Sequence, residues 1–119
     1  MKTFRLFLLI IMITTISSTL IAQTTSGTSG KQKTETFKVW GNCNMCKNRI
    51  EKAVKAEGAS AADWNVKTKI LTVTFDPAKT SVDSFSKKLA SVGHDTEKYR
   101  ADDKAYNALD ACCQYTREK

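Results

Sequence analysis

The cysteines are the residues of this chain whose type and spacing could do chemistry. The four cysteines form one Cys-x-x-Cys pair, Cys43 and Cys46, and one adjacent pair, Cys112 and Cys113. Two thiolates at the first spacing can converge on one soft metal ion, or they can oxidise to a disulfide with each other. The pattern therefore predicts either a metal site or a redox site at Cys43 and Cys46.

The elements on either side of this pair follow from the local pattern. Polar and apolar residues alternate over residues 36–40, as in a half-buried strand. Gly41 and Asn42 favour a sharp turn, since both residue types tolerate positive φ. An amphipathic helix ending at Gly58 follows. Ile50, Ala53, Val54 and Glu57 recur along it at three- and four-residue steps, which places them on one face.

This order places Cys43 in the loop and Cys46 in the first turn of the helix. Unpaired backbone N–H groups and the positive end of the helix dipole stabilise a thiolate at such a position. The sequence thus predicts a reactive or metal-binding pair of thiols at the start of the helix.

The remaining elements complete a known arrangement. Residues 62–66 alternate as a second strand, and residues 70–75 form the most strand-like segment of the chain. A second helix begins after the capping residue Ser81 and stops at Gly93. Residues 95–100 read as a short, weaker strand. The order βαββαβ predicts an α+β, ferredoxin-like sandwich with two helices on one face of an antiparallel sheet.

Several stretches of the sequence resemble the heavy-metal-associated domain family. They are residues 36–39, 43–46, 49–54, 71–77 and 93–95. The resemblance covers about residues 34–100 and includes soluble copper chaperones, the amino-terminal modules of copper-transporting ATPases, and periplasmic mercury-binding proteins. It implies that Cys43 and Cys46 capture a metal ion and exchange it with a partner's thiols. The implied partner is a metal-transporting ATPase or another thiol-bearing metal carrier.

The chain departs from the family pattern at the loop. Family members usually carry Gly-Met-x-Cys, with the Met packed beneath the loop. Here the sequence is Gly41-Asn42-Cys43, which is one residue shorter and lacks that Met. Met45, between the two cysteines, either fills the gap or faces solvent as an adaptable thioether. The departure leaves the metal preference open.

The second departure is a C-terminal tail, residues 101–119, with the rhythm of a helix. In the predicted fold the fourth strand starts near the cysteine loop and ends at the opposite pole. Six extended residues travel about 20 Å away, and ten helical residues return about 15 Å. We therefore expect Cys112 and Cys113 to come back toward Cys43 and Cys46. On this route the tail helix covers the open face of the sheet, where Trp40, Ile70 and Thr72 point.

The ligand set suggests which metal is bound. Two thiolates with no nearby imidazole suit a soft, low-coordinate ion, and Cu(I) is the preferred candidate. Zn(II) normally takes four ligands. If Cys112 and Cys113 join as additional ligands, a four-sulfur site for Zn(II), Cd(II) or Hg(II) becomes an alternative. The neighbouring residues expected to tune the site are His94, Met45 and Lys47. His94 either hydrogen-bonds a cysteine sulfur or is exposed at the helix end, and Lys47 either lowers a thiol pKa or is simply solvated.

The main competing function is a thiol–disulfide oxidoreductase, because Cys-x-x-Cys between a strand and a helix is also how those enzymes begin. Against it, the single proline, Pro77, follows Asp76 in a turn and the chain is too short for a thioredoxin-like fold. A second alternative is two structural disulfides, although a Cys-x-x-Cys bridge constrains little chain. We therefore expect a metal carrier and not an enzyme.

The start of the chain predicts export. Lys2 and Arg5 precede an uncharged stretch closed by Ala22, as in a cleaved leader over residues 1–22. The predicted order is then a flexible linker over 23–33, the metal-binding domain over 34–100 and the tail over 101–119, in a periplasmic or secreted protein that is not held in the membrane. Cleavage removes two of the positive charges and lowers the net charge from +7 to +5. Because these charges are scattered, we expect no nucleic-acid partner, and either a monomer or a metal-bridged dimer.

Overall fold

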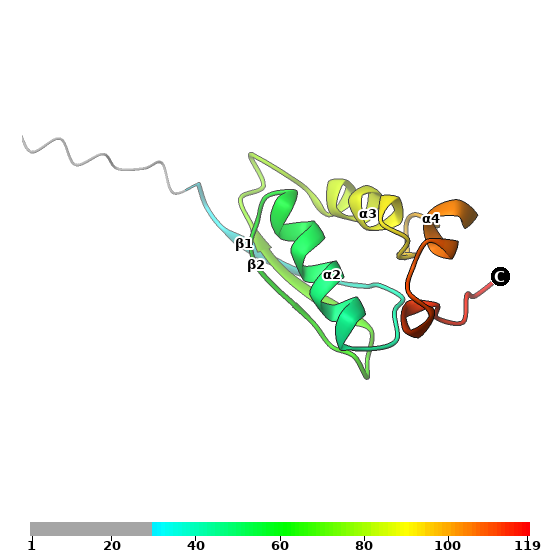
Figure 1. Ribbon diagram of the computed structural model, residues 1–119. Helices are drawn as coiled ribbons and strands as arrows, with labels where there is room; N and C mark the ends of the chain where they lie inside the picture. Colours follow the sequence, from blue (N-terminus) through cyan, green and yellow to red (C-terminus); the bar gives the residue numbers. More distant parts are fainter. Residues whose placement is uncertain (1–29) are drawn as a thin grey trace, which may run out of the picture.

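The computed structural model describes residues 30–119 (Figure 1). The predicted leader over residues 1–22 and residues 23–29 of the predicted linker lie outside the described residues. The elements are β1 (Lys33–Lys38), α2 (Asn44–Ala56), β2 (Ala59–Trp64), β3 (Ile70–Phe75), α3 (Val82–Ser91), α4 (Asp103–Asn107) and the 3-10 helix η2 (Ala111–Cys113). Within residues 30–119, no helix is both long enough and apolar enough to cross a membrane.

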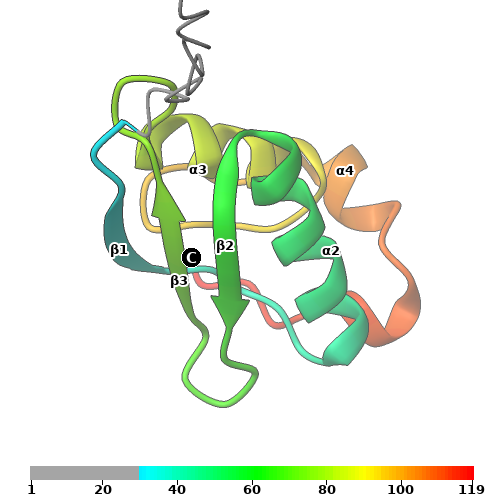
Figure 2. The ribbon, with the colours of Figure 1, turned by 90° about the vertical axis from the view of Figure 1, so that its left-hand side faces the viewer.

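The three strands form one antiparallel sheet in the order β1-β3-β2. Helices α2 and α3 cover one face of this sheet (Figures 1 and 2). The core between the layers contains Phe37, Val39, Ile50, Val54, Trp64, Leu71, Val73, Phe75, Phe85 and Leu89. The predicted α+β class and its ferredoxin-like placement of two helices on one sheet face are confirmed.

The predicted ends of the helices are also confirmed. The side chain of Ser81 accepts a hydrogen bond from the backbone N–H of Ser84 at 3.2 Å and so caps α3. Gly58 and Gly93 follow the two helices with φ of +107° and +100°, a region that favours glycine. The second strand ends at Trp64 and not at Val66. The side-chain oxygen of Asn65 accepts hydrogen bonds from the backbone N–H groups of Lys67 and Thr68, which starts a turn there.

The fourth strand predicted over residues 95–100 is not formed. This segment forms only an isolated antiparallel bridge, between Thr96 and Val39, the residue just after β1. A tight turn interrupts it, because the Thr96 N–H donates to the Tyr99 carbonyl at 2.8 Å and the Tyr99 N–H donates to the Thr96 hydroxyl at 3.0 Å. The chain thus turns back directly after this bridge instead of continuing as a strand.

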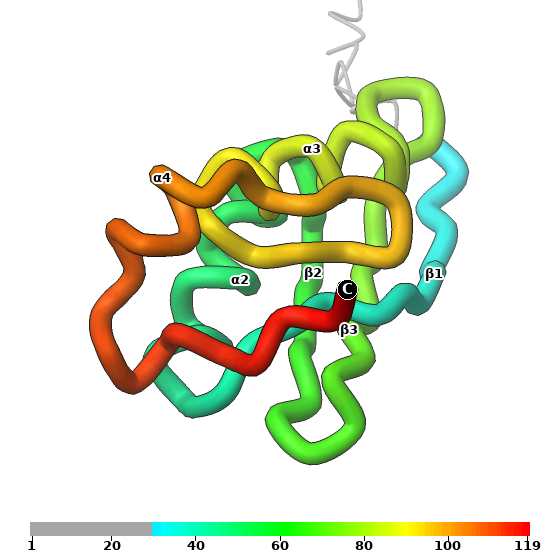
Figure 3. Tube along the Cα trace, turned by 90° about the vertical axis from the view of Figure 1, so that its right-hand side faces the viewer, coloured from blue at the N-terminus to red at the C-terminus, as the bar shows by residue number. Residues whose placement is uncertain are grey.

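The tail takes a different route from the one predicted. Its helix, α4, lies beside the end of α3 and not over the open face of the sheet, which leaves Thr36 exposed and Ile70 and Thr72 half-buried (Figures 1 and 3). A Cβ built on Gly93 would lie 2.7 Å from the Ala105 carbonyl oxygen, so the glycine allows this close approach. From α4 the tail continues to the loop that carries Cys43, and the predicted return of Cys112 and Cys113 to this pole is observed.

Candidate metal centre

The site is built around the start of α2. Cys43 is the N-cap residue of this helix and Cys46 lies in its first turn, as the sequence predicts. Their Sγ atoms are 3.8 Å apart. Cys46 is fully buried, whereas Cys43 is partly exposed. The loop therefore presents one sulfur toward solvent and holds the other inside.

The loop itself is shaped by Gly41 and Asn42. Gly41 does not have the positive φ that we expected, since Gly58 and Gly93 are the glycines in residues 30–119 that do. The reason for a glycine is steric, because a Cβ here would lie 3.0 Å from the Trp64 ring and 3.1 Å from Cys46 Cβ. The N–H of Asn42 donates to Cys46 Sγ at 3.3 Å. The loop thus packs against the buried sulfur and donates a hydrogen bond to it.

The start of the helix makes the Cys43 thiol more acidic than an ordinary cysteine. The backbone N–H of Cys46 is the main cause that lowers the pKa of Cys43 to about 7 from an ordinary 9.0, and the N–H of Met45 acts in the same direction. These N–H groups form no capping hydrogen bond of standard geometry, so their effect is electrostatic. Thiol and thiolate forms of Cys43 are therefore both well populated near neutral pH.

The tail adds two more sulfurs. Cys113 Sγ lies 3.8 Å from Cys43 Sγ, and the carbonyl oxygen of Cys113 lies 4.0 Å from Cys46 Sγ. The Sγ atoms of Cys43, Cys112 and Cys113 all lie within 4.8 Å of one another. Cys113 is fully buried and Cys112 is exposed. Burial raises the pKa of the Cys113 thiol, and its neighbour Cys43 raises that of Cys112.

The other residues predicted to tune the site lie at different distances from it. Met45 faces solvent, and Cys112 Sγ donates to its thioether at 3.4 Å. The ammonium of Lys47 is turned away from the sulfurs toward the carboxylates of Glu51 and Asp63, and Asp63 is the main cause that raises the lysine's pKa. The structure thus brings Met45 to the sulfurs and gives Lys47 a different set of partners.

His94 is buried completely, so the interpretation of an exposed histidine at the helix end is wrong. Its Nδ1 donates to the Trp40 carbonyl at 2.9 Å, and its ring stacks on Tyr115. Burial lowers its pKa and favours the neutral ring. Nε2 has no hydrogen-bond partner among the described residues. His94 therefore fixes the chain just before the loop, and its hydrogen bond goes to a carbonyl and not to a sulfur.

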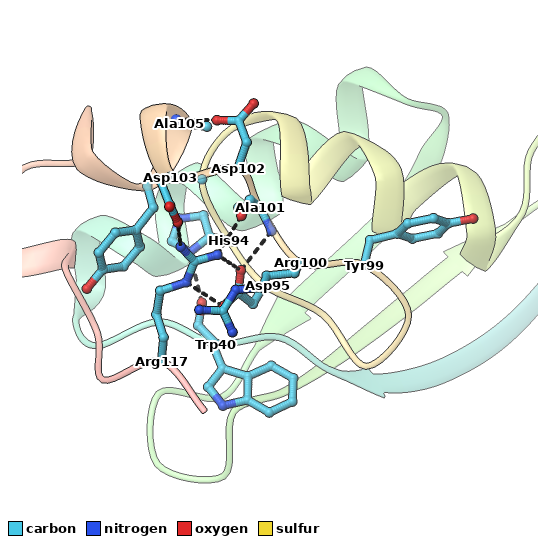
Figure 4. Close-up of polar contacts among 12 residues, drawn as sticks. Trp40, His94, Asp95, Tyr99, Arg100, Ala101, Asp102, Asp103, Ala105 and Arg117 are labelled. Atoms are coloured by element: carbon cyan, nitrogen blue, oxygen red, sulfur yellow. Dashed lines mark hydrogen bonds and ion pairs between the residues drawn. The ribbon is translucent and has the colours of Figure 1, made fainter. Parts of the chain in front are cut away.

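The sequence reasoning missed two residues that hold the tail in place. Tyr115 donates to the Gly93 carbonyl and accepts from the Asp95 N–H, both at 2.8 Å. Arg117 forms two hydrogen bonds with the Asp95 carboxylate, at 2.8 and 2.9 Å (Figure 4). Each partner of this ion pair is almost buried, with side-chain exposures of 11% and 10%. The sequence shows a tyrosine and an arginine near the end of the tail, but it does not show their partners, which lie about twenty residues earlier in the chain.

The family comparison matches this architecture. The family model of the heavy-metal-associated domain matches residues 36–95, which include the end of β1 and all of α2, β2, β3 and α3 but exclude the tail. The mercuric transport protein periplasmic component of Pseudomonas aeruginosa is 39% identical over 64 residues, which are 52% of this chain and 70% of that protein. The copper-exporting P-type ATPase of Staphylococcus saprophyticus subsp. saprophyticus is 38% identical over 56 residues. That match covers 46% of this chain but only 7% of the ATPase.

Solved structures agree with the sequence relatives. Oxidized MerP from Ralstonia metallidurans CH34 superposes with a TM-score of 0.51 and 38% identity, over 56% of this chain and 94% of MerP. The CopZ metallochaperone superposes with a TM-score of 0.51 and 27% identity, over 54% of this chain and 98% of CopZ. Both similarities cover little more than half of the chain.

Proposed function

This chain belongs to the heavy-metal-associated domain family, and on that basis we propose that it binds a soft metal ion through Cys43 and Cys46 and passes the ion on by thiolate exchange. The observation that carries this proposal is the 3.8 Å separation of the two Sγ atoms at the start of α2. The low pKa of Cys43 adds to it, because the thiolate is the form that binds metal.

The separation fits a shared metal ion. At a metal–sulfur distance of about 2.3 Å, two sulfurs of one ion lie about 4.6 Å apart in a linear arrangement, about 4.0 Å in a trigonal one and about 3.8 Å in a tetrahedral one. The Cys43 and Cys46 sulfurs at 3.8 Å thus need little movement to bind any of these. This spacing supports the proposal that the two sulfurs share one ion.

We infer that Cu(I) is the preferred cargo. Thiolate ligands select soft ions, and Cu(I) binds well with two or three of them. The relatives support a soft cargo, since one is named copper-exporting and another mercuric. Hg(II), Cd(II) and Zn(II) are the competing ions, and Zn(II) needs more ligands than this pair supplies.

The exposures of the two sulfurs suggest how the ion leaves. A partner thiolate reaches the ion beside Cys43, which is partly exposed, while Cys46 is buried. A new sulfur–metal bond forms to the partner as the bond to Cys43 breaks, and the bond to Cys46 follows. The fitting partners are a metal-transporting ATPase or another thiol-bearing carrier, and we propose that the protein is a carrier and not an enzyme. Turnover in a disulfide-reduction assay without tight metal binding would instead favour an oxidoreductase.

We also propose that the protein is exported, to the periplasm or the outside of the cell. The support is the leader-like pattern of residues 1–22, together with a relative named as a periplasmic component. Detecting a product that begins after Ala22 in an exported fraction tests this proposal, and an intact Met1 in the cytoplasm would contradict it.

The metal proposal is tested by anaerobic titration of the protein with Cu(I) and Zn(II) against competing chelators. The variants are Cys43→Ser and the double variant Cys43→Ser/Cys46→Ser. Asn48→Ser is the matched control, since it puts the same serine on an exposed position of α2. We expect the control to bind one Cu(I) like the parent and both cysteine variants to lose tight binding. Parental affinity in the double variant would overturn the proposal.

A further inference from the structure

Cys43 is shared between two groups of sulfurs. On one side Cys46 lies 3.8 Å away on the same helix. On the other side Cys113 lies 3.8 Å away on the tail, and Cys112 completes a group in which all three Sγ atoms lie within 4.8 Å. These spacings fall close to the span of about 3.8–4.6 Å that sulfurs of one metal ion occupy. Two overlapping ligand sets therefore meet at Cys43.

The position of the tail sulfurs does not depend on a loose chain end. Tyr115 is 2% exposed and lies between the Gly93 carbonyl and the Asp95 N–H. Tyr106 packs edge-on against the Tyr115 ring and donates to its carbonyl. Arg117 closes the arrangement through the buried ion pair with Asp95 and also donates to Asp103 at 2.9 Å (Figure 4). Tyr106 precedes the two cysteines and Tyr115 and Arg117 follow them, so this anchor holds Cys112 and Cys113 at the loop from both sides.

The anchor lies in the part of the chain that the family match does not include. The match ends at residue 95, whereas Tyr106, Tyr115 and Arg117 all come later. The tail thus brings two thiols to the place where, by the proposed function, a partner's thiols must arrive.

We propose that the tail is a built-in exchange partner, in which Cys112 and Cys113 join Cys43 as a three-sulfur site for a soft d10 ion such as Cu(I). This inference rests on the proposed function of Cys43 and Cys46. The ion moves between the two sets without leaving the protein, because Cys43 belongs to both. The tail set retains the ion against competitors, and a partner must displace three sulfurs instead of two.

The exchange balances without a redox step. As the bonds from the ion to Cys112 and Cys113 form, the bond to Cys46 breaks and the bond to Cys43 is kept. Each thiol that binds releases its proton to solvent, and Cys46 takes one proton up. No electron moves, so the metal keeps its oxidation state. An exposed sulfur, Cys112, lies at the outer edge of this set, 3.4 Å from the Met45 thioether.

The first test counts the sulfurs on the metal. The parent protein, loaded anaerobically with one equivalent of Cu(I), is measured by X-ray absorption spectroscopy. We expect three sulfur ligands in the parent and two in Cys112→Ser/Cys113→Ser. The double variant should also release Cu(I) to a competing chelator roughly 100-fold faster, because a tethered ligand acts at a high effective concentration. The parent's sulfur count needs no variant to fold.

The second test separates this inference from the proposed function. Cys46→Ser should still bind one Cu(I) tightly, and the triple variant Cys46→Ser/Cys112→Ser/Cys113→Ser should not. Circular dichroism and thermal melts of every variant show that the fold is kept. Two sulfurs in the parent, with Cys46→Ser losing Cu(I) as completely as Cys43→Ser, would overturn the tail site and leave the two-cysteine function standing. Failure of the proposed function itself has a different signature, since Cys43→Ser/Cys46→Ser would then bind like the parent.

Discussion

The replacement of Arg117 by methionine tests how firmly the tail is held. Met keeps much of the aliphatic volume of Arg117 but removes both hydrogen bonds to the Asp95 carboxylate. Removing one partner of a buried ion pair costs roughly 3–5 kcal/mol. We use the lower end of this range, because the Asp95 carboxylate still accepts the hydrogen bond from the Ala101 N–H at 2.8 Å and is solvated again when the tail detaches. We therefore expect a loss of about 3 kcal/mol, which is about a 100-fold increase in the open population of the tail.

The assay is the rate at which a thiol reagent labels Cys113, which is fully buried while the tail is docked. A Cys112→Ser background makes Cys113 the single thiol in its tryptic peptide, so mass spectrometry reports its labelling alone. We expect the reagent to label Cys113 about 100-fold faster in the Arg117→Met variant than in the parent when both are measured at the same pH.

The matched control is Lys87→Met, which breaks the pair between Lys87 and Asp83. This pair has side-chain exposures of 62% and 43%, and such solvent-exposed pairs contribute little to stability. The control should therefore leave the labelling of Cys113 within a few-fold of the parent. If Arg117→Met also labels Cys113 at the parental rate, the pair between Arg117 and Asp95 does not hold the tail, and the reasoning is refuted.

Three further predictions follow from the same structure. Because the pKa of Cys43 is near 7, its rate of alkylation by iodoacetamide should be half-maximal near pH 7 and should decrease at lower pH. Cys112 is exposed but has a raised pKa, so peptide mapping should show that it reacts more slowly than Cys43 at pH 7. The opposite order would contradict the argument from the helix start. Burial of Asp95 raises its pKa, but Arg117 and the Ala101 N–H outweigh burial and leave it below the ordinary 3.8. The stability from this carboxylate is thus present above the ordinary pKa of 3.8 and is lost as pH falls through the lowered pKa. The urea midpoints of the parent and Asp95→Asn should therefore approach each other as the pH falls below 3.8, and a constant difference would argue against the pair. Gly93→Ala should lower the free energy of unfolding in urea by about 2–4 kcal/mol, since it combines positive φ with a Cβ 2.7 Å from the Ala105 carbonyl oxygen. Gly58→Ala, where the nearest atom is at 3.4 Å, should lower it by about 1–2 kcal/mol. Equal losses would mean that α4 moves away from the added methyl group without cost.

The elements with local causes could be predicted from the sequence. The alternation of Leu71, Val73 and Phe75 puts the three on one buried face of β3, as expected from a period of two. Ser81 caps α3 because its hydroxyl reaches an N–H only three residues away. The same holds for Cys43 and Cys46, whose separation depends on one helical turn. In each case the interacting groups are near neighbours in the chain.

The features that could not be predicted have distant causes. Residues 95–100 predict only a short, weak strand, and Asp95 is bound by Arg117, twenty-two residues later, while the Thr96–Tyr99 turn ends the pairing. His94 is buried because the Tyr115 ring stacks on it from the tail. No pattern within a few residues of Asp95 or His94 contains these partners, so the expected exposed histidine and fourth strand were reasonable from local propensity alone.

The tail and the loop supply their sulfurs in the same way, with one buried sulfur and one more accessible sulfur each. Cys46 and Cys113 are fully buried, whereas Cys43 is partly exposed and Cys112 is exposed. By the proposed exchange, an incoming thiolate would meet the ion at the edge formed by Cys43 and Cys112, and the buried sulfurs would be the last to be displaced. Because the accessible sulfurs belong to different segments, a partner could displace one of them while the tail stays docked. In this proposal, retention of the ion depends on how many sulfurs bind it, and its release depends on which of them a partner can reach.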